Sequence, residues 1–202
     1  MNVFINCPLD ETYVPLFRPL VFTLLYFGLH PVSATQDTDS SSNRLEKIII
    51  LMKNSEIGIH DLSRIKSSKA GEYSRMNMPF ELGIDYCLKR LVDGCHGMIL
   101  VLEDEPYSYQ KGLSDYAGFD ILSHKGEPTK IVKVVRDWLV NNGIVDPDDA
   151  KGSTAIWYEY NDCWSFIYDE LVAKGYSPAD TDDIPYNEFR SYVEQWIANK
   201  KK

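Results

Sequence analysis

Short apolar runs alternate along this chain with stretches in which apolar residues recur at helical spacing. The runs that predict β-strands lie at residues 3–7, 30–34, 56–60, 97–102 and 118–124. The run 97–102 has no alternating polar positions, which is typical of a central parallel strand covered on both faces. Helices are predicted at residues 13–27, 43–55, 80–91, 107–116 and 129–142. This order predicts an α/β fold of flavodoxin-like type, a five-stranded parallel sheet flanked by helices.

The predicted helix 80–91 bears most directly on function. The residues whose spacing predicts its buried apolar stripe are Phe80, Ile84, Cys87, Leu88 and Leu91. Asp85 and Lys89 lie four positions apart, which predicts an ion pair on the solvated side of the helix.

Composition changes at residues 146–149, Asp-Pro-Asp-Asp, and this divides the chain into 1–146 and 147–202. The second part predicts two helices, 154–174 and 186–199, separated by the polar segment 177–183 and packed as a hairpin on the first part. The aromatic residues of the first of these helices either pack in the core or form a partner surface; they are Trp157, Tyr158, Tyr160, Trp164, Phe166 and Tyr168.

Charge and composition exclude several classes of protein. The 202 residues carry a formal net charge of −9, which disfavours binding to the phosphate backbone of bulk nucleic acid. The longest apolar run, 20–29, is too short to span a bilayer, and residues 1–7 read as a strand rather than a signal peptide. We therefore expect a cytoplasmic protein with no membrane association. Its cysteines lack metal-site spacing, which predicts free thiols and no metal centre; they are Cys7, Cys87, Cys95 and Cys163.

Polar residues follow the first and third predicted strands, where a parallel sheet binds its ligands. Asn6, Pro8 and Asp10 end the first strand, and Asp61 and Ser63 end the third. Turn formation by the Asn and Asp side chains is the alternative to ligand binding. His124 ends the last predicted strand, and we expect it to be exposed or structural.

The segment Asn77–Gly83 opens the helix after the third strand and carries Glu81. We expect Asp61 to face the same crevice as Glu81. A glutamate in a first helical turn is also favoured by the helix dipole alone. Asn77 either caps this helix, with Pro79 in its first turn, or binds substrate, and Phe80 completes the candidate site. Sequence motifs of kinases, NTPases, serine hydrolases and metalloproteases are absent.

Three segments, 4–10, 59–63 and 77–83, resemble a bacterial TIR-like group. That group is related in fold to nucleoside 2-deoxyribosyltransferases and to Toll/interleukin-1 receptor (TIR) domains, and the resemblance covers residues 1 to about 140. It implies that Glu81 is a catalytic carboxylate, that Asp61 and Asn77 contact ribose hydroxyls, and that Asn6 and Asp10 shape the pocket.

The resemblance implies cleavage of an N-glycosidic bond, with NAD or a related nucleotide as substrate and no cofactor. A carboxylate can stabilise or attack the cationic ribosyl centre that forms as this bond breaks. Nicotinamide is already cationic in NAD and needs no proton donor to leave. The resemblance also implies a homo-oligomer and a context of bacterial stress or antiphage signalling. A non-catalytic nucleotide sensor or adaptor using the same crevice, and a nucleoside deoxyribosyltransferase, remain alternatives.

Overall fold

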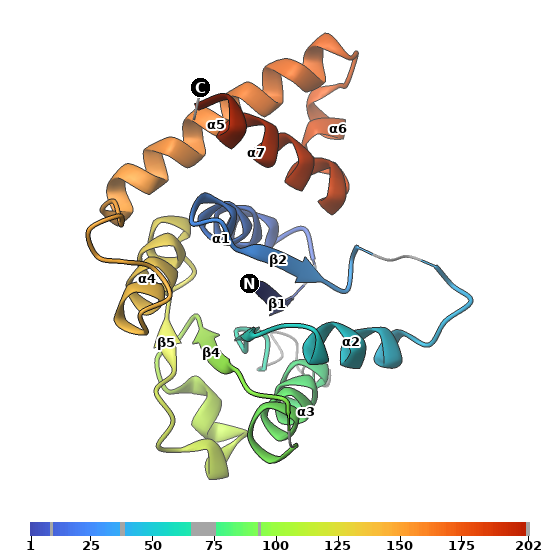
Figure 1. Ribbon diagram of the computed structural model, residues 1–202. Helices are drawn as coiled ribbons and strands as arrows, with labels where there is room; N and C mark the ends of the chain where they lie inside the picture. The colour runs from blue at the N-terminus through green and yellow to red at the C-terminus, as the bar shows by residue number, and fades with distance from the viewer. Residues whose placement is uncertain (9, 37–38, 66–75, 93, 201–202) are drawn as a thin grey trace.

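The structure is a computed structural model that describes residues 1–8, 10–36, 39–65, 76–92 and 94–200. Its strands are β1 (Asn2–Asn6), β2 (His30–Ser33), β3 (Ile57–Asp61), β4 (Met98–Glu103) and β5 (Leu122–Ser123). They form one parallel sheet in the order β2-β1-β3-β4-β5 (Figure 1). The predicted flavodoxin-like α/β fold is confirmed.

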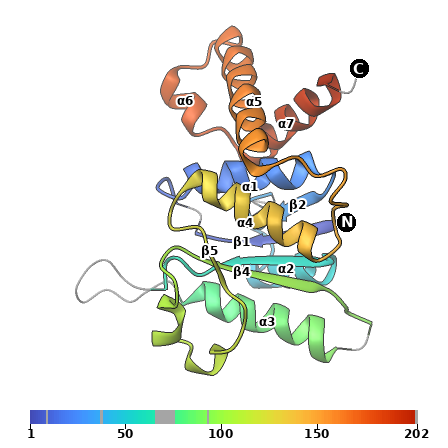
Figure 2. The same ribbon diagram turned by 90° about the vertical axis from the view of Figure 1, so that its left-hand side faces the viewer.

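Helices cover both faces of this sheet and extend beyond it. They are α1 (Val14–Tyr26), α2 (Arg44–Lys53), α3 (Asn77–Leu91), α4 (Pro128–Asn141), α5 (Ser153–Ala173), α6 (Pro178–Asp182) and α7 (Tyr186–Lys200). Helices α1 and α4 lie on one face and α2 and α3 on the other (Figures 1 and 2). The remaining helices, α5 to α7, lie on the outer side of α1.

The alternation of side chains along β1 decides which helices each residue meets. Val3 and Ile5 belong to the large core under α1 and α4, together with Ile57 and Ile59 of β3. Phe4 points to the other face, where it packs with residues of α2 and α3. The same alternation places His60 and Asp61, the last two residues of β3, on opposite faces of the sheet.

The C-terminal helices share the large core with the first part of the chain. Trp157, Tyr160, Trp164 and Phe166 of α5 pack against the large core. Tyr158 and Tyr168 are 65% and 39% exposed. Most of the aromatic residues of α5 therefore serve packing rather than an open surface. The predicted polar segment 177–183 contains the short helix α6.

Two predictions for the region after β4 need correction. Residues 107–116 form two 3-10 helices, η1 (Ser108–Lys111) and η2 (Ser114–Tyr116), in place of one α-helix. The expected strand 118–124 shrinks to β5, because Gly118 has a φ of 107° and residues before Leu122 do not pair with β4. The predicted loop 66–75 lies outside the described residues, as do residues 37–38 of the loop 35–42.

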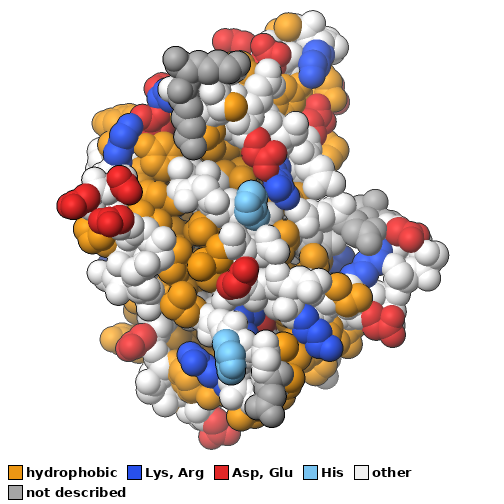
Figure 3. Space-filling model, viewed as in Figure 1, with side chains coloured by type: hydrophobic (Ala, Val, Ile, Leu, Met, Phe, Trp, Pro, Cys, Tyr) orange, Lys and Arg blue, Asp and Glu red, His pale blue; other side chains and the backbone are white. Residues whose placement is uncertain are grey.

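Surface features add little to the prediction of function. On the face seen in Figure 3, basic side chains lie singly among acidic and apolar ones. No helix within the described ranges is long and apolar enough to cross a membrane.

All four cysteines are free, and Cys7 and Cys163 are buried. Cys87 was predicted to be buried because it belongs to an apolar stripe, but it is exposed.

Candidate functional site

The carboxyl ends of β1 and β3 lie side by side and form the base of the candidate site. Asn6 pairs in register with His60, and the chain continues from β3 towards α3. Because α3 follows a parallel strand and returns over the sheet, its first turns lie nearest this edge. Helix α3 begins at Asn77, so Glu81 lies in its second turn rather than its first.

Helix α3 buries a polar face, which contradicts the stripe predicted from its apolar residues. Its buried residues are Glu81, Leu82, Asp85, Leu88 and Lys89. Phe80 and Leu91, two members of the predicted stripe, are 58% and 73% exposed. The physical reason is that Asn6, Gly58 and His60 of β1 and β3 present polar or small groups to this helix beside Phe4, so its charged residues turn inward. The Asp85–Lys89 pair forms, but it is buried rather than solvated.

Asn6, His60, Asp85 and Lys89 form a continuous buried chain of polar contacts. The Asn6 Nδ2 atom lies 3.0 Å from His60 Nδ1 and donates to the Met78 carbonyl at 3.2 Å. His60 Nε2 lies 2.9 Å from Asp85 Oδ2, and the Lys89 ammonium donates to the other carboxylate oxygen. This chain ties α3 to the ends of β1 and β3.

The protonation state of His60 follows from its neighbours. The Asn6 amide nitrogen can only donate, so His60 Nδ1 accepts, and the proton on Nε2 is donated to Asp85. Burial lowers the pKa of His60 despite the adjacent carboxylate, which agrees with a neutral ring. Burial opposes ionisation of Asp85, but His60 and Lys89 outweigh it and hold its pKa below the usual value.

Gly58 makes room for this chain on the α3 side of β3. A Cβ atom at this position would lie 2.0 Å from Asp85 Oδ2 and 3.0 Å from His60 Nε2. Any larger residue would therefore displace the carboxylate from the histidine. A glycine inside a strand is a usual mark of such a close approach.

Glu81 lies on the same helical face as Asp85 but one turn nearer the edge of the sheet, about 6 Å along the axis. Glu81 is 8% exposed, and no hydrogen bond joins its carboxylate to any of the described residues. Burial raises the pKa of Glu81 to about 7, and the charge of Arg44, the first residue of α2, offsets part of this effect. This side chain is a desolvated acid poised to change charge near neutral pH.

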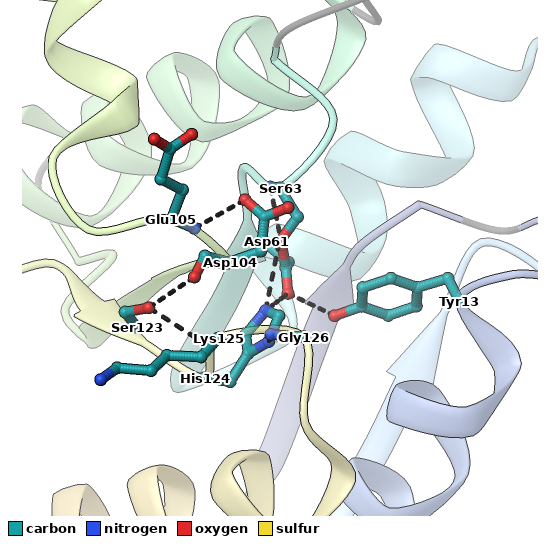
Figure 4. A network of polar contacts seen from close by, with 9 residues as sticks. All are labelled: Tyr13, Asp61, Ser63, Asp104, Glu105, Ser123, His124, Lys125 and Gly126. Carbon is teal, nitrogen blue, oxygen red and sulfur yellow. Dashed lines mark hydrogen bonds and ion pairs between the residues drawn. The ribbon is translucent and has the colours of Figure 1, made fainter. Parts of the chain in front are cut away.

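Asp61 belongs to a second network, on the opposite face of the sheet (Figure 4). It accepts hydrogen bonds from the Tyr13 hydroxyl, from the Ser63 backbone and hydroxyl, and from His124 Nε2 at 2.9 Å. Burial opposes ionisation of Asp61, but these donors outweigh it and hold its pKa below the usual value. Asp61 has no exposed surface, and the structure does not bring its side chain together with that of Glu81.

His124 completes this second network in a fixed tautomer. Its Nδ1 accepts from the Gly126 N–H at 3.0 Å, so Nε2 carries the proton that it donates to Asp61. The Ser63 hydroxyl lies 3.1 Å from the same Nε2. His124 is fully buried. The network links the ends of β3 and β5 to the start of α1. Its contacts hold these elements together.

The remaining candidate residues fall into two places. Pro8 is buried and Asp10 is partly exposed, and both border a cavity of about 390 Å³ next to α1 and α7, which Glu81 does not line. Asn77 and Phe80 are exposed near Glu81 at the start of α3. Asn77 is the first helical residue, and the capping position belongs to Met76, which makes no side-chain cap. The predicted capping role of Asn77 is therefore wrong.

His60 and Tyr13 are the members of these networks that sequence reasoning missed, whereas Asp85 and Lys89 were predicted as a pair but on the solvated side. The spacing of Glu81, Asp85 and Lys89 at every fourth position is the signal that could have identified a polar buried face. Gly58, within the apolar run before His60, is a second such signal. For Tyr13 we find none, because its contact with Asp61 joins residues 48 positions apart.

The described residues contain no group of three or more His, Cys, Asp or Glu side chains arranged to hold a metal ion. Comparisons with protein-family models, with curated proteins and with solved structures found no significant match to the chain. Function must therefore be inferred from the site itself.

Proposed function

We propose that the protein cleaves the N-glycosidic bond of NAD or a related nucleotide, with Glu81 as the catalytic carboxylate. The observation that supports this most directly is the state of Glu81. It is buried near the carboxyl edge of the sheet, lacks hydrogen bonds from described residues, and has a pKa of about 7. A carboxylate removed from water and without fixed donors interacts strongly with a positive charge that develops beside it.

The chemistry needs one such group. As the bond from the ribosyl carbon to the nicotinamide nitrogen breaks, both electrons pass to the nitrogen and neutralise its charge. Positive charge remains on the ribosyl carbon and ring oxygen, where the Glu81 carboxylate stabilises it. Water then adds to the carbon and loses a proton to solvent. Arg44, close enough to influence Glu81, is suited to a phosphate group of the nucleotide.

The buried chain below Glu81 supports the proposal in a second way. Asn6 donates to the Met78 carbonyl in the first turn of α3, and Asp85 is held by His60 and Lys89 one turn after Glu81. Glu81 is thus anchored on both sides along its helix. Such rigid support from neighbouring hydrogen bonds is what a catalytic side chain requires.

The test is to incubate the full chain with NAD and, separately, with a 2′-deoxynucleoside, and to identify products by mass spectrometry. We expect nicotinamide release from NAD that is lost in Glu81→Gln and retained in Glu46→Gln, an exposed acid on α2 that serves as the matched control. Turnover that survives Glu81→Gln would refute the mechanism. Saturable NAD binding without turnover would favour the nucleotide sensor instead.

The pH dependence separates the two enzymatic alternatives. NAD cleavage uses the ionised carboxylate, so its rate should rise with pH and level off near or below the pKa of about 7, because the cationic nicotinamide ring of the substrate favours ionisation of Glu81. Transfer from a neutral purine deoxynucleoside needs a proton on the leaving base. If Glu81 is that acid, the rate of the transfer reaction should fall above pH 7.

Dependence of specific activity on protein concentration would reveal whether the proposed homo-oligomer is the active form.

A further inference from the structure

The cavity of about 390 Å³ that borders Pro8 and Asp10 is separate from Glu81. It lies on the α1 side of the sheet, whereas α3 covers the opposite side. Residues of α1 form one wall, and residues between the end of α6 and the first turns of α7 form the other. The hydroxyl of Tyr186 donates to the Pro31 carbonyl at 2.7 Å, which fixes the second wall against β2.

The cavity has an aromatic and aliphatic lining. Phe17 and Tyr186 face it with ring centres 5.6 Å apart, and Val14 and Phe189 extend the apolar surface. Because the hydroxyl of Tyr186 is already engaged by the backbone, its ring rather than its polar end is available to a ligand. A concave apolar surface of this size is typical of small-molecule sites.

Four carboxylates and one guanidinium line the same cavity. The acids are Asp10, Glu11, Asp182 and Asp183, of which the last three are exposed. The cation, Arg18, is buried and donates to the carbonyls of Thr181 and Asp182 at 3.4 and 2.7 Å.

The guanidinium of Arg18 is held in place by neutral partners and keeps its positive charge. It also lies over the ring of Trp164, 4.4 Å from the ring centre. Its positive charge acts on Asp182 and Asp183, and Asp10 pairs with Arg64 at 3.7 Å. Four acids against these two cations still leave the mouth of the cavity with a negative potential. It disfavours phosphates and carboxylates and favours positive ligands.

We propose that this cavity binds an organic cation with an apolar body, such as an ammonium group carried on an aromatic ring system. The apolar body packs on Phe17, Tyr186 and Phe189, and the cationic group meets Asp182 and Asp183 at the mouth. The faces of the aromatic rings attract the same charge. The site is independent of the nucleotide chemistry proposed for Glu81, because Glu81 does not line the cavity and lies on the other side of the sheet.

Isothermal titration of the full chain with three indole compounds tests this assignment. Tryptamine, indole-3-ethanol and indole-3-acetate share one ring and differ in charge. We expect tryptamine to bind most tightly and indole-3-acetate most weakly. The double variant Asp182→Asn/Asp183→Asn should weaken tryptamine binding roughly 3- to 25-fold, as two partly exposed ion pairs allow, and leave indole-3-ethanol unchanged. Asp169→Asn, an exposed acid on α5, is the matched control.

Equal affinity for the three compounds, or no binding of tryptamine at millimolar concentration, would overturn the proposal. An unchanged tryptamine affinity in the double variant would do the same. The salt dependence of tryptamine binding to the unaltered protein gives a second readout that needs no variant. Affinity should fall as ionic strength rises, and a salt-independent affinity counts against the acidic mouth.

Discussion

Replacing Glu81 with glutamine should stabilise the protein, by an amount that grows with pH. Burial raises the pKa of Glu81 from 4.5 to about 7, and a tenfold change in proton affinity corresponds to about 1.4 kcal/mol. Full ionisation of the folded protein therefore costs roughly 3 kcal/mol. This is an upper value, because the residue is 8% exposed and water screens part of its charge.

The sign follows from proton linkage. Between pH 4.5 and 7 the folded protein holds the Glu81 proton more tightly than the unfolded chain. Wild-type stability therefore falls as pH rises through this window and levels off above it. Glutamine does not ionise and escapes this loss. We expect Glu81→Gln to be more stable than wild type by about 1 kcal/mol at pH 5 and by up to about 3 kcal/mol at pH 8.

Urea unfolding at pH 5 and pH 8 measures the difference, with Glu46→Gln as the exposed control. The gain in free energy of unfolding should increase with pH in Glu81→Gln and not in the control. A gain that is the same at both pH values, or a loss at pH 8, would show that Glu81 is not a desolvated acid. The proposed function would then lose its main support, since it depends on that state.

Three further substitutions test the buried contacts. Asp85→Asn leaves the buried ammonium of Lys89 without its carboxylate and should lower the free energy of unfolding by about 3–5 kcal/mol; a loss below 1 kcal/mol in urea titrations would contradict the ion pair. Gly58→Ala places a Cβ atom 2.0 Å from Asp85 Oδ2 and should cost about 1–3 kcal/mol, so thermal unfolding at the wild-type temperature would contradict the close approach. Arg18→Met removes the carbonyl contacts and the stacking on Trp164 and should lower the free energy of unfolding by about 1–3 kcal/mol. If the variant leaves the resistance of α5 to α7 to limited proteolysis unchanged, Arg18 does not anchor these helices.

The fold could be predicted because β1, β3 and most of β4 are buried on both faces of the sheet. Continuous apolar runs at β1, β3 and β4, with helical spacing between them, leave few alternatives to a parallel sheet with helices on both sides. The length of β5 could not be predicted. Only Leu122 and Ser123 pair with β4, and the apolar residues before them, which suggested a longer strand, pack within the loop instead.

The candidate site was predicted less well, because periodicity shows which residues share a face but not where that face points. In α3, Phe80, Cys87 and Leu91 of the predicted apolar stripe are exposed. The charged residues are buried instead, towards Asn6 and His60. The contact of Asn6 with His60 joins residues 54 positions apart, and that of His60 with Asp85 joins residues 25 apart. No local pattern specifies such contacts. Likewise, the pleat of β3 turned Asp61 away from α3.

A comparison of the hydrogen-bond donors around the buried acids supports the proposed role of Glu81. Four Asp or Glu residues are buried within the described ranges: Asp61, Glu81, Asp85 and Glu103. Asp61 and Asp85 accept from several side chains, and Glu103 accepts from the backbone of Tyr107 and Tyr109 and from the Ser108 hydroxyl. Glu81 alone among the four has no such donor from the described residues. Among the described residues, three buried acids have hydrogen-bond donors and the fourth, near the edge where parallel sheets bind ligands, has none, which supports the proposed role of Glu81.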